Sequence, residues 1–402
     1  MGRNALGGFA LGVVTTVATI AVAGSVSGAF DASAHRSQGA PKLSRTAFDQ
    51  AVDAVAERYY EPVDQSAVLS AGLRAMLAQL DPHSHFMSAA DRKALRTRRG
   101  SGVTGLSVAL RRDDGDAHLE VLAVAPGSPA QREGVRPGDH VVRIGPRDVG
   151  SLATQLEVEM LLAGRVGEQL ALLVQSADAP EPRALALVLD KPRTATLDSA
   201  VVENGDGRKY VHMVLRRFGP ESGDAFNRVL ASRSRLLGDA LAGVIIDLRG
   251  NPGGEVNEAL VIADHFVEHG VLTRTRGRGG RILREESAHA ANTDTTTKVV
   301  VLQDRHSASA SELLAVALQD HGRALVVGER SYGKGTVQEV LGLADGSAVT
   351  FTIARYYSPG DRRIDGEGVA PDVPVLLEPS MPAAGVVDDG LRAALDAFAF
   401  AP

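Results

Sequence analysis

The alternation of strand-like and helix-like segments after residue 208 most constrains the fold of this chain. Short runs rich in Val, Ile and Leu, such as 242–248 and 298–302, are typical of buried strands. We expect further strands at 209–215, 271–276, 324–328, 337–341 and 349–356, and helices at 223–237, 255–268 and 309–319. Strands that alternate with helices over this length predict an α/β domain of catalytic size.

The preceding part of the chain has a different texture. Residues 101–190 contain short apolar runs split by turns, with helical stretches near 130–133 and 152–162, and predict a small β-rich module. Apolar residues at helical spacing predict helices around 48–59 and 68–80, and another at 388–398. The expected domains are a helical region, the β-rich module, the α/β domain and a C-terminal tail, at 35–100, 101–190, 191–380 and 381–402.

An uncharged apolar segment runs from Ala5 to Phe30. Its length favours an uncleaved membrane anchor, whereas the Ala32-Ser33-Ala34 triplet favours a cleaved signal peptide. Both interpretations of residues 1–34 place the rest of the protein outside the cytoplasm. A buried helix is the third alternative.

Composition excludes several function classes. The chain has 43 basic and 49 acidic residues and a net charge of −6, so it lacks the basic surface of a nucleic-acid-binding protein. It has no cysteine, which excludes disulfides, a cysteine nucleophile and thiolate metal ligands.

Ser309 is the first candidate for chemistry. It lies between the apolar run 299–302 and an apolar helix, within the sequence S-A-S-A-S-E that starts at Ser307. A serine at a helix N-terminus faces free backbone N–H groups that can hold an oxyanion. The alternative is a capping box, because Ser309 and Glu312 have the capping spacing.

Two glycine-containing loops accompany this serine. Gly253 and Gly254 follow the buried run 244–248, and a pair of glycines lets backbone amides approach a ligand closely. Lys334 lies between Gly333 and Gly335. Without a histidine in a Ser-His-Asp context, a neutral lysine is the expected base.

A lysine must lose its charge to act as a base, and burial lowers the pKa of a lysine toward that state. Gln338 lies on the same strand face as the lysine and could orient it. A glycine-rich turn with an exposed lysine is the alternative.

Three similar motifs are weaker. A phosphate loop at 328–334 lacks the Ser or Thr that binds magnesium, and an S-x-x-K motif at 331–334 conflicts with the flanking glycines. His265 and His269 match H-x-x-E-H of zinc peptidases, but they precede Gly270, where histidine commonly caps a helix.

Taken together, the motifs resemble the carboxyl-terminal processing, or tail-specific, proteases, serine endopeptidases that carry a PDZ domain. The match covers nearly the whole chain after the N-terminal segment. It consists of D-P-H-S-H-F from Asp81, G-L-S-V from Gly105, D-L-R-G-N-P-G-G from Asp247, S-A-S-A-S-E from Ser307, G-K-G-T-V-Q from Gly333 and G-V-A-P-D-V from Gly368. Asp304 and His306 depart from the Asn and Gly that are usual in this family, and the first PDZ strand lacks the usual aromatic residue.

The resemblance implies a role for each matching residue. Ser309 would be the nucleophile, Lys334 the general base and Gln338 the residue that orients the base. The oxyanion hole would use the amide of Ala310 with that of Gly253 or Gly254. The PDZ carboxylate-binding loop would consist of Gly105, Leu106, Ser107 and Val108.

The expected function is therefore that of an exported serine endopeptidase that cleaves proteins near their C-termini. Its PDZ domain would bind the substrate tail, with an adaptor protein as a further partner. No metal, other cofactor or nucleic acid is implied. The alternative is an exported PDZ binding or scaffold protein with an inactive hydrolase domain.

Overall fold

The structure is a computed structural model. It describes residues 44–98, 102–113, 116–125, 127–152, 154–176, 178–179, 181–191, 197–377 and 383–402. The predicted anchor or signal at 1–34 lies outside the described residues. Among those that are described, no helix is both long and apolar enough to cross a bilayer.

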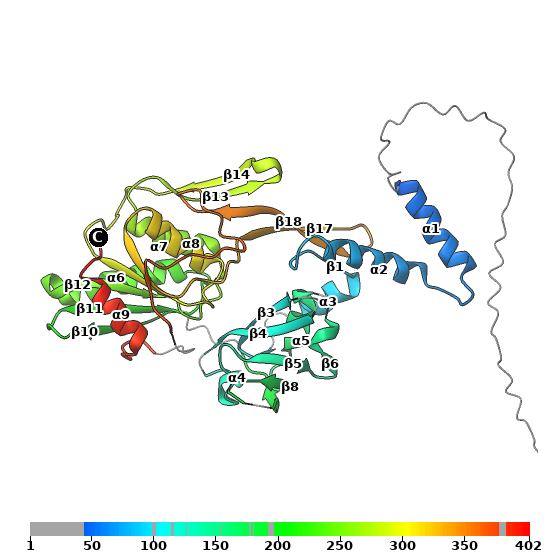
Figure 1. Ribbon diagram of the computed structural model, residues 1–402, viewed down its shortest axis with the longest axis horizontal. Helices are drawn as coiled ribbons and strands as arrows, with labels where there is room; N and C mark the ends of the chain where they lie inside the picture. The colour runs from blue at the N-terminus through cyan, green and yellow to red at the C-terminus, as the bar shows by residue number, and fades with distance from the viewer. Residues whose placement is uncertain are drawn as a thin grey trace, which may run out of the picture.

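The α/β domain is built on a six-stranded sheet (Figure 1). Its order is β10 (Leu197–Glu203), β11 (Lys209–Leu215), β12 (Leu241–Asp247), β15 (Val299–Gln303), β16 (Ala324–Gly328) and β19 (Val373–Pro374). Strand β10 is antiparallel to β11, whereas β11 to β19 are parallel. The carboxyl ends of β12, β15 and β16 therefore share one edge of the sheet, where α/β folds bind ligands.

Helices cover both faces of this sheet. Helices α6 (Ser222–Leu237), α7 (Val256–Phe266) and α8 (Ala310–Asp320) pack on the face that includes Val244 and Ile246. Helix α9 (Asp389–Ala397) packs on the opposite face with Ile245 and Val300. Consecutive strand residues alternate between two apolar layers, which explains why the runs are apolar without interruption. The predicted C-terminal tail is thus part of this domain's core.

A second sheet extends from the domain (Figure 1). Its long strand β18 (Ala348–Tyr357) pairs with β1 (His85–Met87), β13 (Val271–Gly277) and β17 (Thr336–Gly342), and β13 also pairs with β14 (Ile282–Ser287). The segment that begins at Asp81 is tied to the α/β domain through the β1–β18 pairing. Helices α1 (Arg45–Arg58), α2 (Gln65–Ala78) and α3 (Ala89–Arg98) complete the N-terminal region.

The β-rich module has its own apolar core, which lies between its main sheet and its two helices. Its main sheet runs in the order β3 (Leu106–Asp113), β4 (Asp116–Val124), β5 (His140–Ile144), β8 (Gln169–Gln175) and β9 (Arg183–Val188), with β6 (Arg147–Asp148) beside β5. Strands β2 (Gly102–Val103) and β7 (Ala163–Gly164) form a small second sheet, and the helices are α4 (Pro129–Arg132) and α5 (Gln155–Leu162).

Two expectations from the sequence differ from the structure. Strands β10 and β14 were not predicted. The helix expected at 255–268 ends at Phe266, so His265 and His269 do not share a helix face as their spacing suggested. The His269 side chain is 88% exposed beyond the helix.

Candidate active site

Ser309 lies at the junction between β15 and α8. Its backbone has φ 59° and ψ −115°, a region that a residue with a Cβ rarely adopts. Its N–H donates to Glu312 Oε2 at 2.7 Å, which is one half of a capping box. This bond uses the backbone N–H of Ser309 and does not involve the hydroxyl. In the other half of the box the Ser309 hydroxyl oxygen faces the Glu312 backbone N–H, and a hydroxyl that accepts there keeps its own proton, so capping does not exclude nucleophilic attack.

The glycine loop after β12 lies directly against the serine. A Cβ on Gly253 would be 2.8 Å from the Ser309 Cβ and 2.9 Å from the Ala310 nitrogen, so only glycine fits there. Asn251 O accepts hydrogen bonds from Ala308 N at 2.9 Å and Ser311 Oγ at 3.0 Å, which joins the two loops. The predicted oxyanion residues Gly253 and Ala310 are therefore brought together.

The oxyanion donors are not all free in this conformation. The N–H of Gly253 donates to Asn251 Oδ1 at 2.9 Å. The backbone of Gly254 is held against Phe218, because a Cβ there would lie 2.0 Å from Phe218 O. A substrate oxyanion would thus have to compete with the Asn251 side chain for the amide of Gly253.

Glu312 connects the serine to the lysine loop. Its side chain is fully buried and also accepts hydrogen bonds from Ser331 Oγ at 2.6 Å, Gly333 N at 2.6 Å and Lys334 N at 2.9 Å. Burial raises the pKa of Glu312, although these donors act in the opposite direction. One carboxylate thus binds the backbone N–H groups of both predicted dyad residues.

The side chains of the predicted dyad are not joined. Lys334 is exposed, and its amine makes no hydrogen bond or ion pair with the described residues. Burial lowers the pKa of His83, and the neighbouring charge of Lys334 lowers it further. Gln338 Nε2 donates to Thr336 Oγ1 at 2.6 Å, and no bond links it to Lys334.

Asp304 and His306 have partners that the sequence did not reveal. Asp304 Oδ1 accepts the backbone N–H groups of Gly250, His306 and Ser307, each at 3.0 Å, so this carboxylate is used within the loop. His306 is buried, with Nδ1 3.5 Å from Asp304 Oδ2 and Nε2 3.7 Å from Glu120 Oε1 of β4.

The β-rich module also contacts the lysine loop. The Arg111 guanidinium lies 4.2 Å from the centroid of the Tyr332 ring, and its Nε is 2.8 Å from Glu120 Oε2. Neighbouring strands of the module therefore contact residues just before Ser309 and just before Lys334.

A buried ion pair lies at the end of β12, directly before the glycine loop. Asp247 Oδ2 is 2.7 Å from Arg249 NH2 and 3.0 Å from His212 Nε2, and Arg249 NH1 reaches Asp388 at 2.7 Å. Burial alone would raise the pKa of Asp247, but Arg249 and His212 outweigh it and lower this pKa. These ion pairs therefore hold the D-L-R motif, from which the glycine loop continues, in a fixed position.

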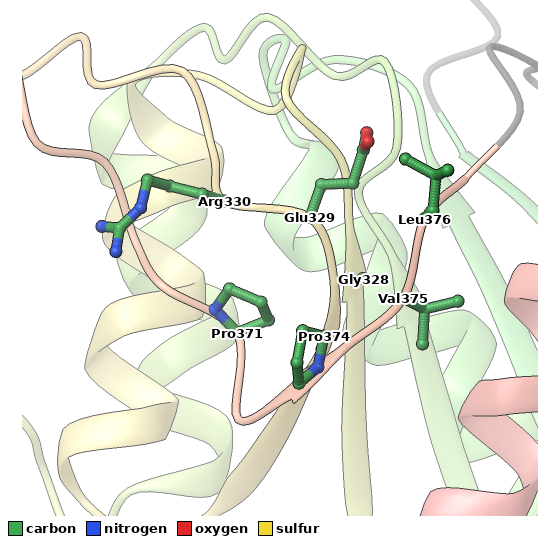
Figure 2. Close-up of a pocket in the computed structure, with 7 residues that line it drawn as sticks. All are labelled: Gly328, Glu329, Arg330, Pro371, Pro374, Val375 and Leu376. Atoms are coloured by element: carbon green, nitrogen blue, oxygen red, sulfur yellow. The ribbon is translucent and has the colours of Figure 1, made fainter.

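A shallow pocket of about 370 Å³ lies near the carboxyl end of β16 (Figure 2). It is lined by Gly328, Glu329, Arg330, Pro371, Pro374, Val375 and Leu376. None of these is a predicted site residue, and Arg330 is held by a bond to Glu367 O at 3.0 Å. Its lining includes Glu329, whose Oε1 lies 4.0 Å from Arg305 NH1, but it includes neither Ser309 nor Lys334.

Comparison with known proteins identifies the family of this chain. Residues 210–375 match the model of peptidase family S41, and residues 120–176 match that of the PDZ domain. A chloroplastic C-terminal processing peptidase of Tetradesmus obliquus is 34% identical over 325 residues, which are 78% of this chain and 69% of that protein. The chain belongs to the carboxyl-terminal processing peptidases.

Further relatives support the assignment. A carboxy-terminal-processing protease of Bartonella bacilliformis is 28% identical over 328 residues, 82% of this chain and 74% of that one. The solved structure of a photosystem II D1 C-terminal processing protease has a TM-score of 0.72 at 30% identity, covering 88% of this chain and 91% of that chain. The predicted family, the fold class and the serine-type peptidase activity are confirmed, and the β-rich module is a PDZ domain.

Proposed function

We propose that this carboxyl-terminal processing peptidase cleaves proteins near their C-termini by acyl transfer through Ser309 and Lys334. The observation that carries the proposal is the Glu312 carboxylate, which binds the backbone N–H groups of both residues. The two positions are therefore held at one site, although their side chains are not joined in this conformation.

The proposed reaction starts when the Lys334 side chain turns from solvent toward Ser309 and is present as a neutral amine. It takes the proton of the Ser309 hydroxyl as the oxygen bonds to the substrate carbonyl carbon. The amides of Ala310 and of Gly253 or Gly254 stabilise the oxyanion, at about 3–4 kcal/mol for each donor.

Collapse of the tetrahedral intermediate breaks the peptide bond. The protonated Lys334 gives its proton to the leaving amine, and water then hydrolyses the acyl-enzyme with the neutral lysine as base. Gln338 would orient the amine once Lys334 has turned inward. A substrate tail bound to the PDZ domain, with its carboxylate on the loop 105–108, would be presented to this site.

Cleavage of an unstructured protein tail tests the dyad. We expect Ser309→Ala and Lys334→Ala each to lower kcat by at least about a thousandfold, and Lys334→Arg to give no rescue, because arginine stays charged. Lys209→Ala, which changes an exposed lysine at the start of β11, serves as the control and should retain full activity. Activity that survives Lys334→Ala would contradict the proposed base.

A serine-directed acylating probe separates this proposal from a binding protein with an inactive hydrolase domain. The probe should label the protein as isolated, and the label should be lost in Ser309→Ala. No labelling under conditions that support tail binding would favour the binding protein.

We also propose that the protein acts outside the cytoplasm, held or exported by residues 1–34. The uncharged run from Ala5 to Phe30 supports this location. Determining the N-terminus and the membrane partition of the native protein tests it. An intact N-terminus in the soluble cytoplasmic fraction would contradict it.

A further inference from the structure

One edge of strand β3 in the PDZ domain is not paired with another described strand. Among the described residues, strand β3 pairs with β4 alone and ends its sheet. Val108 and Leu110 are two positions apart, so their main-chain groups point to the same side of the strand. An unpaired edge of this kind is where an extended peptide adds as a further strand.

A side chain of the same domain occupies this edge. Gln155, the first residue of α5, accepts the Leu110 N–H with Oε1 at 2.9 Å and donates Nε2–H to Val108 O at 3.0 Å. One carboxamide therefore satisfies a donor and an acceptor that an added strand would use. Gln155 thus joins the start of helix α5 to the edge of strand β3.

Helix capping does not explain this side chain. Thr154 is the N-cap of α5, and its Oγ1 accepts the Glu157 N–H at 3.3 Å. The Gln155 carboxamide is thus free of any capping role and bonds only to β3 among the described residues.

In the predicted carboxylate-binding loop, a backbone amide is likewise hydrogen-bonded to a side chain of the same domain. Gly105 has φ 79°, and the N–H of Leu106 donates to Thr104 Oγ1 at 3.2 Å. Thr104 is buried, so its hydroxyl is a fixed internal acceptor. The free PDZ domain therefore pairs with its own side chains both a loop amide and two edge groups that a tail would bind.

We propose that the Gln155 carboxamide is a displaceable occupant of the peptide-binding edge, and that a substrate tail binds by taking its place. This rests on the proposed tail binding by the PDZ domain. Each main-chain hydrogen bond that a tail forms at Val108 or Leu110 replaces one that Gln155 already makes, so the net gain is small.

Discrimination among peptides then falls to groups that do not merely replace Gln155. The terminal carboxylate, a charged acceptor for the loop amides, distinguishes a tail from an internal segment, and the side chains of the tail distinguish one tail from another. Gln155 thereby acts as a specificity-determining residue, because it removes the advantage that any extended peptide would have at an open strand edge.

Peptide binding to the full chain carrying Ser309→Ala, which prevents cleavage, tests the proposal. The probe is a pool of fluorescent Gly/Ser peptides with randomised C-terminal positions, prepared with a free carboxylate and in amidated form. We expect Gln155→Ala and Gln155→Leu to bind the carboxylate pool about tenfold more tightly, and to bind the amidated pool measurably. Gln169→Ala, an exposed glutamine on β8, is the matched control and should not change binding.

Hydrogen exchange provides a second readout that does not depend on affinity. In the free protein, the Leu110 amide should exchange faster in Gln155→Ala, and bound peptide should restore its protection in both proteins. If Gln155 only held α5 and β3 together, its loss would let these two elements separate. Peptide binding would then be weaker in the Gln155 variants, the opposite of the expected result.

The outcomes are distinguishable. Carboxylate-dependent binding that is unchanged or weaker in both Gln155 variants would overturn the displacement proposal and leave tail binding intact. Absence of binding in every variant, or binding that is equal for the carboxylate and amidated pools in the parent protein, would overturn the proposed tail binding and this inference with it.

Discussion

At the scale of single residues, one buried carboxylate binds both of the loops that carry the proposed dyad. Glu312 accepts hydrogen bonds from Ser309 N and Lys334 N, and it also binds Ser331 and Gly333. A change of about 1 Å in the relative position of nucleophile and base is enough to slow acyl transfer strongly. We therefore expect Glu312 to be a positioning residue that acts through the two loops.

Glu312→Gln tests this role. The amide can accept at one atom only, and its NH₂ group would face backbone N–H donors, so we expect kcat to fall by about tenfold or more with a smaller change in KM. Glu258→Gln is the control, because Glu258 of α7 likewise accepts two backbone N–H groups, those of Glu221 and Gly223 at the start of α6, but none from Ser309 or Lys334. Tail cleavage measured for both variants decides the matter. Full kcat in Glu312→Gln would show that the loops keep their positions without the carboxylate.

The sequence proposes Ser309 and Lys334 as the dyad residues, but it does not predict their arrangement. Motif spacing pointed to Ser309 and Lys334, and the structure holds their backbones together. The exposed side chain of Lys334 lies between two glycines and has many accessible rotamers, so local sequence does not determine where its amine lies. The Glu120–His306 contact was also beyond prediction, because nothing local in either segment identifies its partner.

At the scale of elements, the structure differs from expectation mainly at sheet edges. Central strands such as β11 and β16 were predicted correctly because burial on both faces leaves continuous apolar runs. Strand β14 has mostly exposed side chains, and in β10, at the edge of the main sheet, all residues but one are partly or fully exposed. Such strands carry polar residues, and their pairing partners supply the signal that their own sequence lacks.

Helix α9 shows how an element at the chain end stabilises the catalytic domain. Phe398, which follows its last turn, packs on Tyr210 with ring centroids 4.4 Å apart, and a Cβ on Gly243 would lie 2.4 Å from its ring. We expect Phe398→Ala to lower the free energy of unfolding of this domain by about 3–5 kcal/mol. Phe400→Ala is the control, because that ring is 80% exposed. Urea unfolding of both variants checks this, and equal stabilities would show that α9 is not anchored by Phe398.

At the scale of the whole molecule, the PDZ domain and the catalytic loops meet through charged groups. Glu120 lies between Arg111 of its own domain and His306 of the serine loop. The histidine ring also lies near Asp304 Oδ2 at 3.5 Å and Arg305 Nε at 3.4 Å. Burial alone would lower the pKa of His306, but the carboxylates of Asp304 and Glu120 outweigh it and raise this pKa to about 9. Conversely, His306 and then Arg111, against the effect of burial, lower the pKa of Glu120 to about 2.

These shifts predict how stability depends on pH. The folded protein holds the His306 proton more tightly than the unfolded chain, where the pKa is about 6.5. The resulting stabilisation, at most about 3 kcal/mol, is fully present below pH 6.5 and is lost as the pH rises through about 9. The Glu120 contribution is present above about pH 4.5 and is lost as the pH falls through about 2.

Thermal unfolding of the full chain between pH 6 and 10 tests the His306 contribution. The parent protein should lose stability across this range more steeply than His306→Gln, whose side chain does not titrate, because the paired carboxylates lose their cation only in the parent. His289→Gln is the matched control: its side chain is 80% exposed beside Asp264, and its curve should follow that of the parent. Parallel curves for the parent and His306→Gln would mean that the histidine carries no charge at this contact. The two domains would then be held by Arg111 and Tyr332 without it.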